Sequence, residues 1–184
     1  MIYPIRAYGD PVLRAKCEVI TDFGDDFQKL VEDMYETMDG SDGVGLAAPQ
    51  IGKSLRLFMI DSTLFDKEKK EGIRTAFVNP VILEETGDEW AFEEGCLSIP
   101  DVREDVNRKP KVKMKYQTIT GEEKEDTFEG MTARVIQHEY DHIEGVLFTD
   151  YISPFKRQLL KGKLTNISKG KVNVHYRMKF AKRK

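Results

Sequence analysis

The sequence predicts an α+β fold, with a single domain over residues 1–184 in which mostly antiparallel sheets pack around a central helix that carries an HExxH motif. Segments with the apolar spacing of helices are interspersed with segments that alternate apolar and polar residues. A chain of 184 residues suits one ordinary domain with a sizeable core. No internal repeat, low-complexity tract or linker rich in Pro, Gly and Ser divides the chain.

The first half of the chain is predicted to contain one helix and two strands. Residues 25–40 should form a helix that ends at Gly40, because apolar residues recur there at helical spacing. These residues are Phe27, Leu30, Val31, Met34, Tyr35 and Met38. The glycine-rich segment 41–52 is expected to be irregular. Two apolar runs predict strands, joined by a loop that holds the charged residues 66–72; the strands are 55–60 and 75–83.

The second half begins with a predicted strand at 111–119, where three lysines alternate with apolar residues, and a turn at 120–122 leads back into 124–128. Apolar residues surround the segment 130–145, which predicts a helix buried among other elements, with Gly145 as its C-terminal cap. Two further elements are expected, a short helix at 153–164 and a strand at 171–180.

Charge is distributed unevenly along the chain. From residue 151 onward, a basic C-terminal tail holds 11 Lys or Arg and no acidic residue, whereas residues 1–150 hold the other 18 basic and all 32 acidic residues and sum to −14. The tail indicates either an anionic partner such as nucleic acid or a solvated, lysine-rich hairpin. No apolar run reaches the roughly 20 residues that span a bilayer, and residues 1–20 lack the pattern of a signal peptide. With two cysteines, a cytoplasmic location is expected.

The segment HEYDH places two histidines one helical turn apart, so that His138 and His142 can face one metal ion, with Glu139 beside the first. A catalytic site usually needs a third protein ligand and one open position. In the protease pattern HExxHxxGxxH the third histidine would fall on Phe148, and no glutamate follows Glu144.

The remaining candidates for the third ligand are the thiols. Cys96 follows Gly95, which would let the backbone come close to the metal-binding helix. Cys17 has no metal-like surroundings and is expected to be a buried, inert thiol. Together with the HExxH helix, this comparison favours Cys96.

Three segments resemble the signature motifs of peptide deformylases: GVGLAAPQ (43–50), EGCLS (94–98) and QHEYDH (137–142). The likeness extends from the DPVLR segment near the N-terminus to FTDYISP near residue 150. It implies a metal-dependent hydrolase that removes the N-formyl group from nascent polypeptides. It also implies that Cys96, His138 and His142 hold iron(II) as the native ion, with nickel, cobalt or zinc able to replace it. The loop at 66–72 and the tail after about 160 are expected to depart from common members.

The resemblance also assigns roles around the metal. Glu139 would be the general base, and the side-chain amide of Gln50 and the N–H of Leu97 would stabilise the oxyanion. The backbone of Gly45 is implied to bind the substrate peptide, and three side chains are implied to line the pocket for its methionine: Val44, Met131 and Val135. Plain core packing is an open alternative for these three side chains. Glu94 and Asp141 are candidates for orienting the ligands.

Two other functions remain open at the level of the sequence. A zinc endopeptidase would also use a metal-bound water, with the same glutamate as its base, but it would cleave internal peptide bonds. A non-catalytic protein with structural zinc would need a fourth protein ligand, which could come from Cys17, His175 or a carboxylate. The expected partners are N-formylmethionyl nascent peptides, with ribosomal RNA as a further candidate for the basic tail and no membrane.

Overall fold

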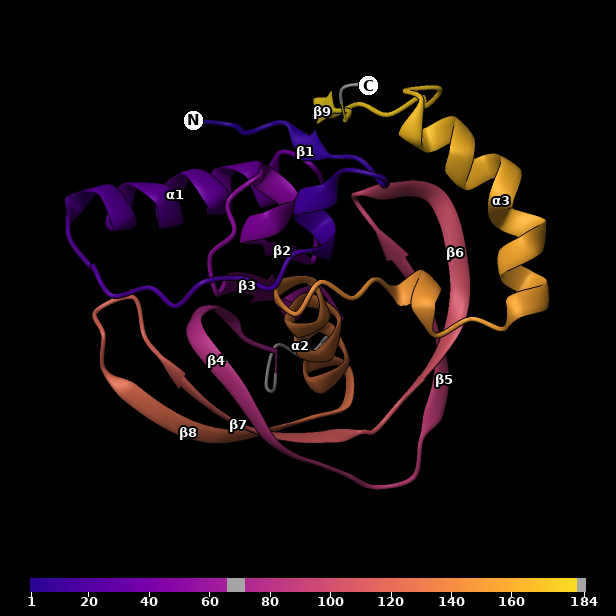
Figure 1. The fold of residues 1–184 in the computed structure, drawn as a ribbon. Coiled ribbons are helices and arrows are strands. Elements are labelled where there is room, and N and C mark those ends of the chain that lie inside the picture. Colours follow the sequence, from indigo (N-terminus) through magenta and orange to yellow (C-terminus); the bar gives the residue numbers. More distant parts are fainter. Residues whose placement is uncertain (66–71, 182–184) are drawn as a thin grey trace.

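The computed structural model describes residues 1–65 and 72–181, in which α2 lies at the centre, strands curve around it, and α1 and α3 lie outside them (Figure 1). The helices are α1 (Asp25–Asp39), α2 (Gly130–Ile143) and α3 (Pro154–Ser168), with 3-10 helices at Pro11–Arg14, Ala48–Ile51, Ser62–Phe65 and Phe148–Asp150. The strands are β1 (Ile5–Arg6), β2 (Gly45–Ala47), β3 (Leu57–Asp61), β4 (Arg74–Thr86), β5 (Trp90–Cys96), β6 (Ile99–Arg108), β7 (Lys111–Gln117), β8 (Glu123–Glu129) and β9 (Met178–Lys179).

The strands form three sheets. The largest is antiparallel, with the order β2-β3-β4-β7-β8, and β5 and β6 form a separate antiparallel hairpin. Only the short pair β1-β9 is parallel among the described strands. The predicted α+β class with mostly antiparallel sheets is therefore confirmed.

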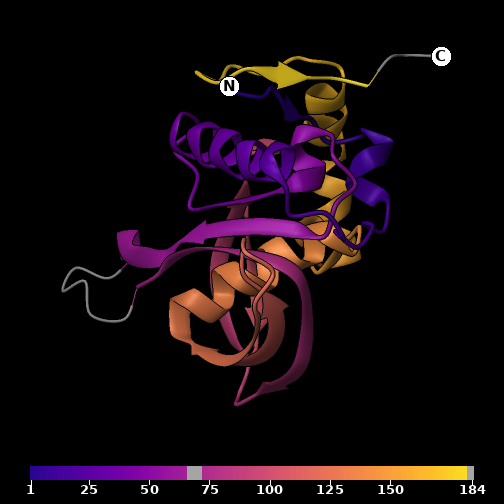
Figure 2. The ribbon, with the colours of Figure 1, turned by 90° about the vertical axis from the view of Figure 1, so that its left-hand side faces the viewer.

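The core consists of three apolar clusters that meet around the strands. One lies between α1 and strands β2, β3 and β4, and a second fills the space between α2 and the large sheet. The third joins β6 to α3 and to the segment before it. Strands of the large sheet curve around α2, and the β5-β6 hairpin lies on another side of it (Figures 1 and 2). Most residues of the central helix are therefore buried, as its sequence pattern predicts.

A bulge in β4 bends the large sheet around α2. Asn79 has a positive φ of 50°, and the register to β7 shifts between Val78 and Val81. The Asn79 side chain exchanges two hydrogen bonds of 2.8 Å with the backbone of Ile20. Asparagine tolerates the left-handed conformation better than most residues, and bulges increase the local bend of a strand.

The C-terminal end of α2 depends on Gly145. Its φ of 77° is typical of the glycine that follows a helix, and the N–H of Val146 donates to the carbonyl of Asp141 at 2.9 Å. A Cβ at Gly145 would lie 2.6 Å from the carbonyl oxygen of Arg14, so a larger residue would also collide with the N-terminal segment. The predicted cap is confirmed.

Two predicted elements are wrong in part. The segment 41–52 is not wholly irregular, because residues 45–47 pair with β3 and residues 48–51 form a 3-10 helix. Residues 171–180, predicted as one strand, alternate between partly buried and exposed side chains, as in extended chain. Only the two residues of β9 pair with another strand, the equally short β1. The charged loop predicted to be unusual falls mainly on residues 66–71, outside the described residues.

The basic tail is not a hairpin. Its residues form α3, whose Leu164 and Ile167 are buried in the third core cluster, and then cross to pair with β1. The predicted short helix is longer than expected, with Ser153 as its N-cap. Over the described residues, no helix is long and apolar enough to cross a membrane.

Candidate metal centre and active site

Helix α2 places the two histidines of HEYDH on one face. Their ring centroids lie 5.2 Å apart, as expected for residues separated by one helical turn. Nδ1 of His138 lies 2.9 Å from Oε2 of Glu94, which leaves its Nε2 as the nitrogen available for a ligand bond. A carboxylate that holds the second ring nitrogen is common behind metal-bound histidines.

The hairpin of β5 and β6 places Cys96 against this helix. Cys96 pairs with Ile99 across a two-residue turn, Leu97-Ser98, so the thiol stands at the tip of the hairpin. Its Sγ lies 3.3 Å from Nε2 of His142, close to the roughly 3.5 Å that tetrahedral geometry gives for zinc-type bond lengths. One ligand atom each from Cys96, His138 and His142 lies within 4.8 Å of the others.

The surroundings of these three donors fit a cation. Burial opposes protonation of His138, but hydrogen bonds with Cys96 and Glu94 outweigh it, so the pKa of His138 lies well above its ordinary value. Burial and the neighbouring His138 hold the pKa of His142 well below its ordinary value. The thiol and the carboxylate thus favour a positive charge at His138, where a bound metal ion would take the place of the proton. His142 is kept neutral, which is the form of imidazole that binds metals.

A closed structural site finds no support in the described part of the chain. The fourth ligand would have to be Cys17, His175 or a carboxylate, but the metal-binding group found there consists of Cys96, His138 and His142. Cys17 is buried in the second core cluster, where burial raises the pKa of its thiol to about 11, as predicted for an inert cysteine. His175 pairs instead with Asp42, at 3.2 Å.

Glu94 is the centre of a buried ion cluster behind the histidine. It accepts two hydrogen bonds from Arg108, at 2.6 and 3.0 Å, and one from Arg134 at 3.0 Å, in addition to its contact with His138. Burial opposes its ionisation, but the hydrogen bonds with His138 and Arg108 hold the pKa of Glu94 well below its ordinary range. The carboxylate therefore stays charged and fixes the ring of His138.

Asp141 is the other candidate for ligand orientation, but it makes no hydrogen bond with a histidine among the described residues. Its carboxylate accepts from Arg108 at 2.8 Å and from the hydroxyl of Tyr151 at 3.0 Å. Asp141 thus supports the metal ligand only indirectly, through Arg108 and Glu94.

Glu139 lies between the ligands in sequence and is 4% exposed. Burial raises the pKa of its carboxyl group to about 7. Among the described residues, the buried Oε2 of Glu139 has no hydrogen-bond partner, so its capacity to accept a hydrogen bond is unused. A carboxylate that is buried, close to the ligands and unpaired is suited to take up and release a proton.

Close backbone approach occurs at Gly45 and not at Gly95. A Cβ on Gly45 would lie 2.4 Å from Oε1 of Glu139, whereas a Cβ on Gly95 would make only ordinary contacts with Arg103, the nearest at 3.4 Å. The expectation that Gly95 provides the close approach is therefore wrong. The small residue that admits Glu139 comes from β2.

Replacing Gly45 with alanine should displace the carboxyl group of Glu139. A shift of about 1 Å in a reacting group can lower the rate on the order of 100-fold, so a loss of this size in kcat is expected. The measurement is the steady-state rate of the hydrolysis that the family resemblance implies, together with metal content.

Gly162 provides the matched control. It lies within α3, and a Cβ there would meet nothing within 4 Å. Gly162→Ala should leave kcat unchanged and stabilise the protein by roughly 0.5–1 kcal/mol. Equal activity in both variants would contradict the proposed packing.

Gln50 is held so that its amide nitrogen points toward Cys96. The N–H of Ala47 donates to Oε1 of Gln50 at 2.8 Å, which directs Nε2 toward Sγ of Cys96 and Oγ of Ser98, each at 3.4 Å. Gln50 is 1% exposed and is the third residue of the 3-10 helix that follows β2. A buried amide fixed at one end presents a preorganised donor at the other.

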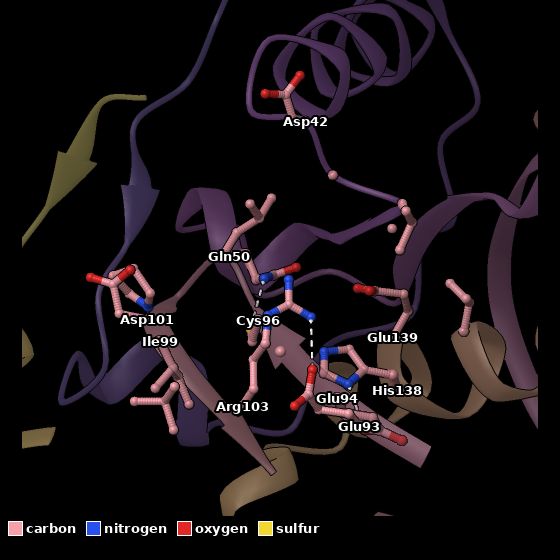
Figure 3. Close-up of a pocket in the computed structure, with 18 of the residues that line it drawn as sticks. Asp42, Gln50, Glu93, Glu94, Cys96, Ile99, Asp101, Arg103, His138 and Glu139 are labelled. Carbon is pink, nitrogen blue, oxygen red and sulfur yellow. Dashed lines mark hydrogen bonds and ion pairs between the residues drawn. The ribbon is translucent and has the colours of Figure 1, made fainter. Parts of the chain in front are cut away.

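The predicted residues surround a cleft of about 830 Å³. Gln50, Cys96, His138 and Glu139 point into the same space, with Asp42 at its upper edge in the view of Figure 3. Nine of the ten predicted site residues line this cleft: Val44, Gly45, Gln50, Cys96, Leu97, Met131, Val135, His138 and Glu139. The tenth, His142, is 1% exposed and lies behind Cys96.

The cleft also contains residues to which the sequence assigned no role. Arg134 lines the cleft but is buried, with its guanidinium 4.3 Å from the ring centroid of Trp90, and it belongs to the Glu94 cluster. The C-terminal residues 173–176 also line the cleft. A buried arginine has no periodic signature, and the position of a terminal segment depends on tertiary contacts.

Comparison with known proteins places this arrangement in a family. A family model described as polypeptide deformylase matches residues 2–158. A peptide deformylase of Cytophaga hutchinsonii is 58% identical over 180 residues, covering 98% of each chain. The crystal structure of a peptide deformylase from Legionella pneumophila is similar, with a TM-score of 0.82 and 41% sequence identity over 93% of this chain and 98% of the other. The crystal structure of the peptide deformylase from Thermus thermophilus gives a TM-score of 0.83 and 40% identity over 92% of this chain and 99% of the other.

The matched region contains the α2 helix, the β5-β6 hairpin and the segment around β2 that together build the cleft. The likeness therefore covers the site as well as the fold. This chain belongs to the peptide deformylase family, whose members are metal-dependent enzymes that remove the N-formyl group from nascent polypeptides.

Proposed function

We propose that Cys96, His138 and His142 hold one divalent ion, with iron(II) as the native metal and nickel, cobalt or zinc as substitutes, and that the site acts on N-formylmethionyl peptides. The observation that carries this proposal is the meeting of three metal-type donors beside an unpaired, buried glutamate in one cleft. A Cys-His₂ set leaves a fourth position open in catalytic sites of this type.

When bound, the ion supplies Lewis acidity and lowers the pKa of water toward neutrality. In the net reaction water adds to the formyl carbon, the formyl C–N bond breaks, and formate and a free amine leave. Glu139 takes a proton from the water and passes it to the leaving nitrogen. Its unpaired Oε2 and its burial suit both transfers.

The oxyanion that forms on the formyl oxygen is stabilised by donors fixed before the reaction. We assign this role to Nε2 of Gln50 and the N–H of Leu97. The first is oriented by Ala47, and the second adjoins Cys96 in the two-residue turn of the hairpin. A preorganised donor of this kind contributes about 3–4 kcal/mol to the stabilisation of a transition state.

The substrate would lie along β2, with the methionine side chain against Val44, Met131 and Val135. β2 is the edge strand of the large sheet, and Gly45 at its start lines the cleft. An extended peptide can pair with such an edge as an added strand. Val135 also belongs to the second core cluster, and Val44 packs against that cluster, so these two residues contribute to the core as well as to the cleft wall.

Metal content tests the ligand set. Cys96→Ala should lose most of the bound metal after anaerobic purification, whereas Cys17→Ala should retain about one ion per chain, because Cys17 lies in the core away from the ligands. The anaerobic wild type should contain iron, and exposure to air should lower its activity more than that of nickel-substituted protein. Full metal content in Cys96→Ala would contradict the proposed ligands.

We propose further that the protein works in the cytoplasm and that the basic residues after 151 contact ribosomal RNA. α3 carries solvent-exposed lysines, and no Asp or Glu follows Asp150 in the sequence. Binding to ribosomes should fall steeply between 50 and 200 mM salt, because contacts with phosphates release counterions.

Charge reversal provides the variants for this ribosome experiment. Lys161→Glu with Lys169→Glu should weaken binding, whereas Lys124→Glu on β8 should not. Sedimentation with purified ribosomes measures both. Absence of binding by the wild type at low salt would end the proposal.

A further inference from the structure

The C-terminal segment after α3 forms one wall of the active-site cleft. Four consecutive residues line it: Asn173, Val174, His175 and Tyr176. The segment is anchored just beyond them, where the N–H of Ile5 donates to the carbonyl of Arg177 at 2.8 Å and β9 pairs with β1. The family model ends at residue 158, so this wall lies outside the residues that the model matches.

Tyr176 connects this wall to the hairpin turn. Its hydroxyl donates to the carbonyl oxygen of Leu97 at 2.8 Å, and its ring packs with Leu97 against the first core cluster. Burial, together with the nearby Cys96, raises the pKa of Tyr176, so the hydroxyl remains a donor at neutral pH. The ion pair of His175 with Asp42 is largely exposed and adds little to the anchoring.

The turn is held at several points around Leu97. The carbonyl of Ser98 accepts from the N–H of Tyr8 at 2.8 Å, and the hydroxyl of Ser98 lies 3.4 Å from Nε2 of Gln50. Sγ of Cys96 lies 3.3 Å from Nε2 of His142. The carbonyl of Leu97 itself is held by Tyr176, so this hydroxyl restrains the backbone torsions of Leu97.

We propose that Tyr176 is a positioning residue for deformylation, which orients the N–H of Leu97 by holding the carbonyl of the same residue. The peptide unit that carries the N–H of Leu97 ends at the Cα of Leu97, and the carbonyl group is bonded to the same Cα. Holding the carbonyl therefore fixes the position of this Cα and, with it, one end of the unit that presents the N–H. The inference rests on the proposed role of Leu97 as an oxyanion donor. It assigns a function in the reaction to a residue outside the three motifs.

The test is Tyr176→Phe in the metal-loaded enzyme, which removes the hydroxyl and keeps the ring. We expect kcat to fall on the order of tenfold with KM unchanged, less than the 10²–10³-fold cost of losing an oxyanion donor itself. A loss in kcat without a change in KM marks an interaction made only in the transition state. Loss of a merely structural wall would instead raise KM.

Tyr116→Phe is the matched control, because its hydroxyl also donates at 2.8 Å, to Asp126 on the outer strands. It should leave kcat and KM unchanged. Metal content and Tm are measured for both variants, and a variant with a lowered Tm is assayed at a temperature where it remains folded.

The outcomes separate this inference from the proposed function. A wild type that releases no formate would overturn the proposed function itself. An active wild type with Tyr176→Phe kinetics within twofold of it, or with a change confined to KM, would overturn the role of Tyr176 alone.

Discussion

Replacing Glu139 with glutamine is expected to lower kcat for formate release by roughly 10²–10⁴-fold, the usual contribution of a positioned general base. The amide keeps the size of the side chain and its contact with Gly45, but it cannot accept the proton of water. Because Glu139 is not among the three ligands, metal content should remain that of the wild type. Formate release and metal content, measured on the same sample, check both statements.

Glu129 supplies the control for this change. It is the N-cap residue of the same helix, and its side chain is largely exposed beside Lys111. Glu129→Gln should leave kcat unchanged. If Glu139→Gln with full metal content kept more than a tenth of the wild-type rate, Glu139 would not be the base.

The second large effect concerns stability and metal binding together. Glu94→Ala would leave Arg134 buried without a carboxylate partner and Arg108 with Asp141 alone, and removing one partner of a buried ion pair costs about 3–5 kcal/mol. The free energy of unfolding should fall by that amount. His138 would also lose the partner of its Nδ1, so metal affinity should fall about 10–100-fold.

The neighbouring Glu93→Ala is the control. Its side chain is 61% exposed and lies 3.8 Å from Arg103, so its replacement should change stability by less than about 0.5 kcal/mol. Urea unfolding of the metal-free proteins and metal titration measure the two effects. Equal stability of the two variants would show that the Glu94 cluster contributes nothing to folding.

Acid should reduce the advantage of the wild type over Glu94→Ala. The pKa of Glu94 is lower in the folded protein than in the unfolded chain, so its ionised form stabilises the fold above the ordinary glutamate pKa of about 4.3. That contribution should decline as the pH falls below this value. Unfolding curves at pH 7 and pH 3.5 test the sign.

The sequence predicted the elements that depend on local periodicity. The helix at 130–145 and the strand at 111–119 follow from the spacing of apolar residues within each segment. Elimination of the other possible ligands led to Cys96. By contrast, Gln50 and Leu97 were accessible only through the family resemblance. A loop glutamine and a backbone N–H carry no chemical signature of their own.

The errors have a common physical origin in tertiary contacts. The segment 171–180 has the alternation of a strand, but alternation does not supply a partner, and only two residues pair. Gly95 looked suited to close approach, yet the contact that requires glycine is between Gly45 and Glu139, which lie 94 positions apart in the sequence. The cluster of Glu94, Arg108 and Arg134 likewise joins β5, β6 and α2.

The central claim is that this cleft hydrolyses a formyl group by means of one metal ion and Glu139. Its most direct test is formate release from formyl-Met-Ala-Ser by anaerobically purified wild type of known metal content, before and after metal removal with a chelator. We predict formate and free Met-Ala-Ser in equal amounts, loss of activity in the chelated protein, and recovery on adding iron(II). Absence of formate from the metal-replete protein, or cleavage of the internal peptide bonds instead, would contradict the account.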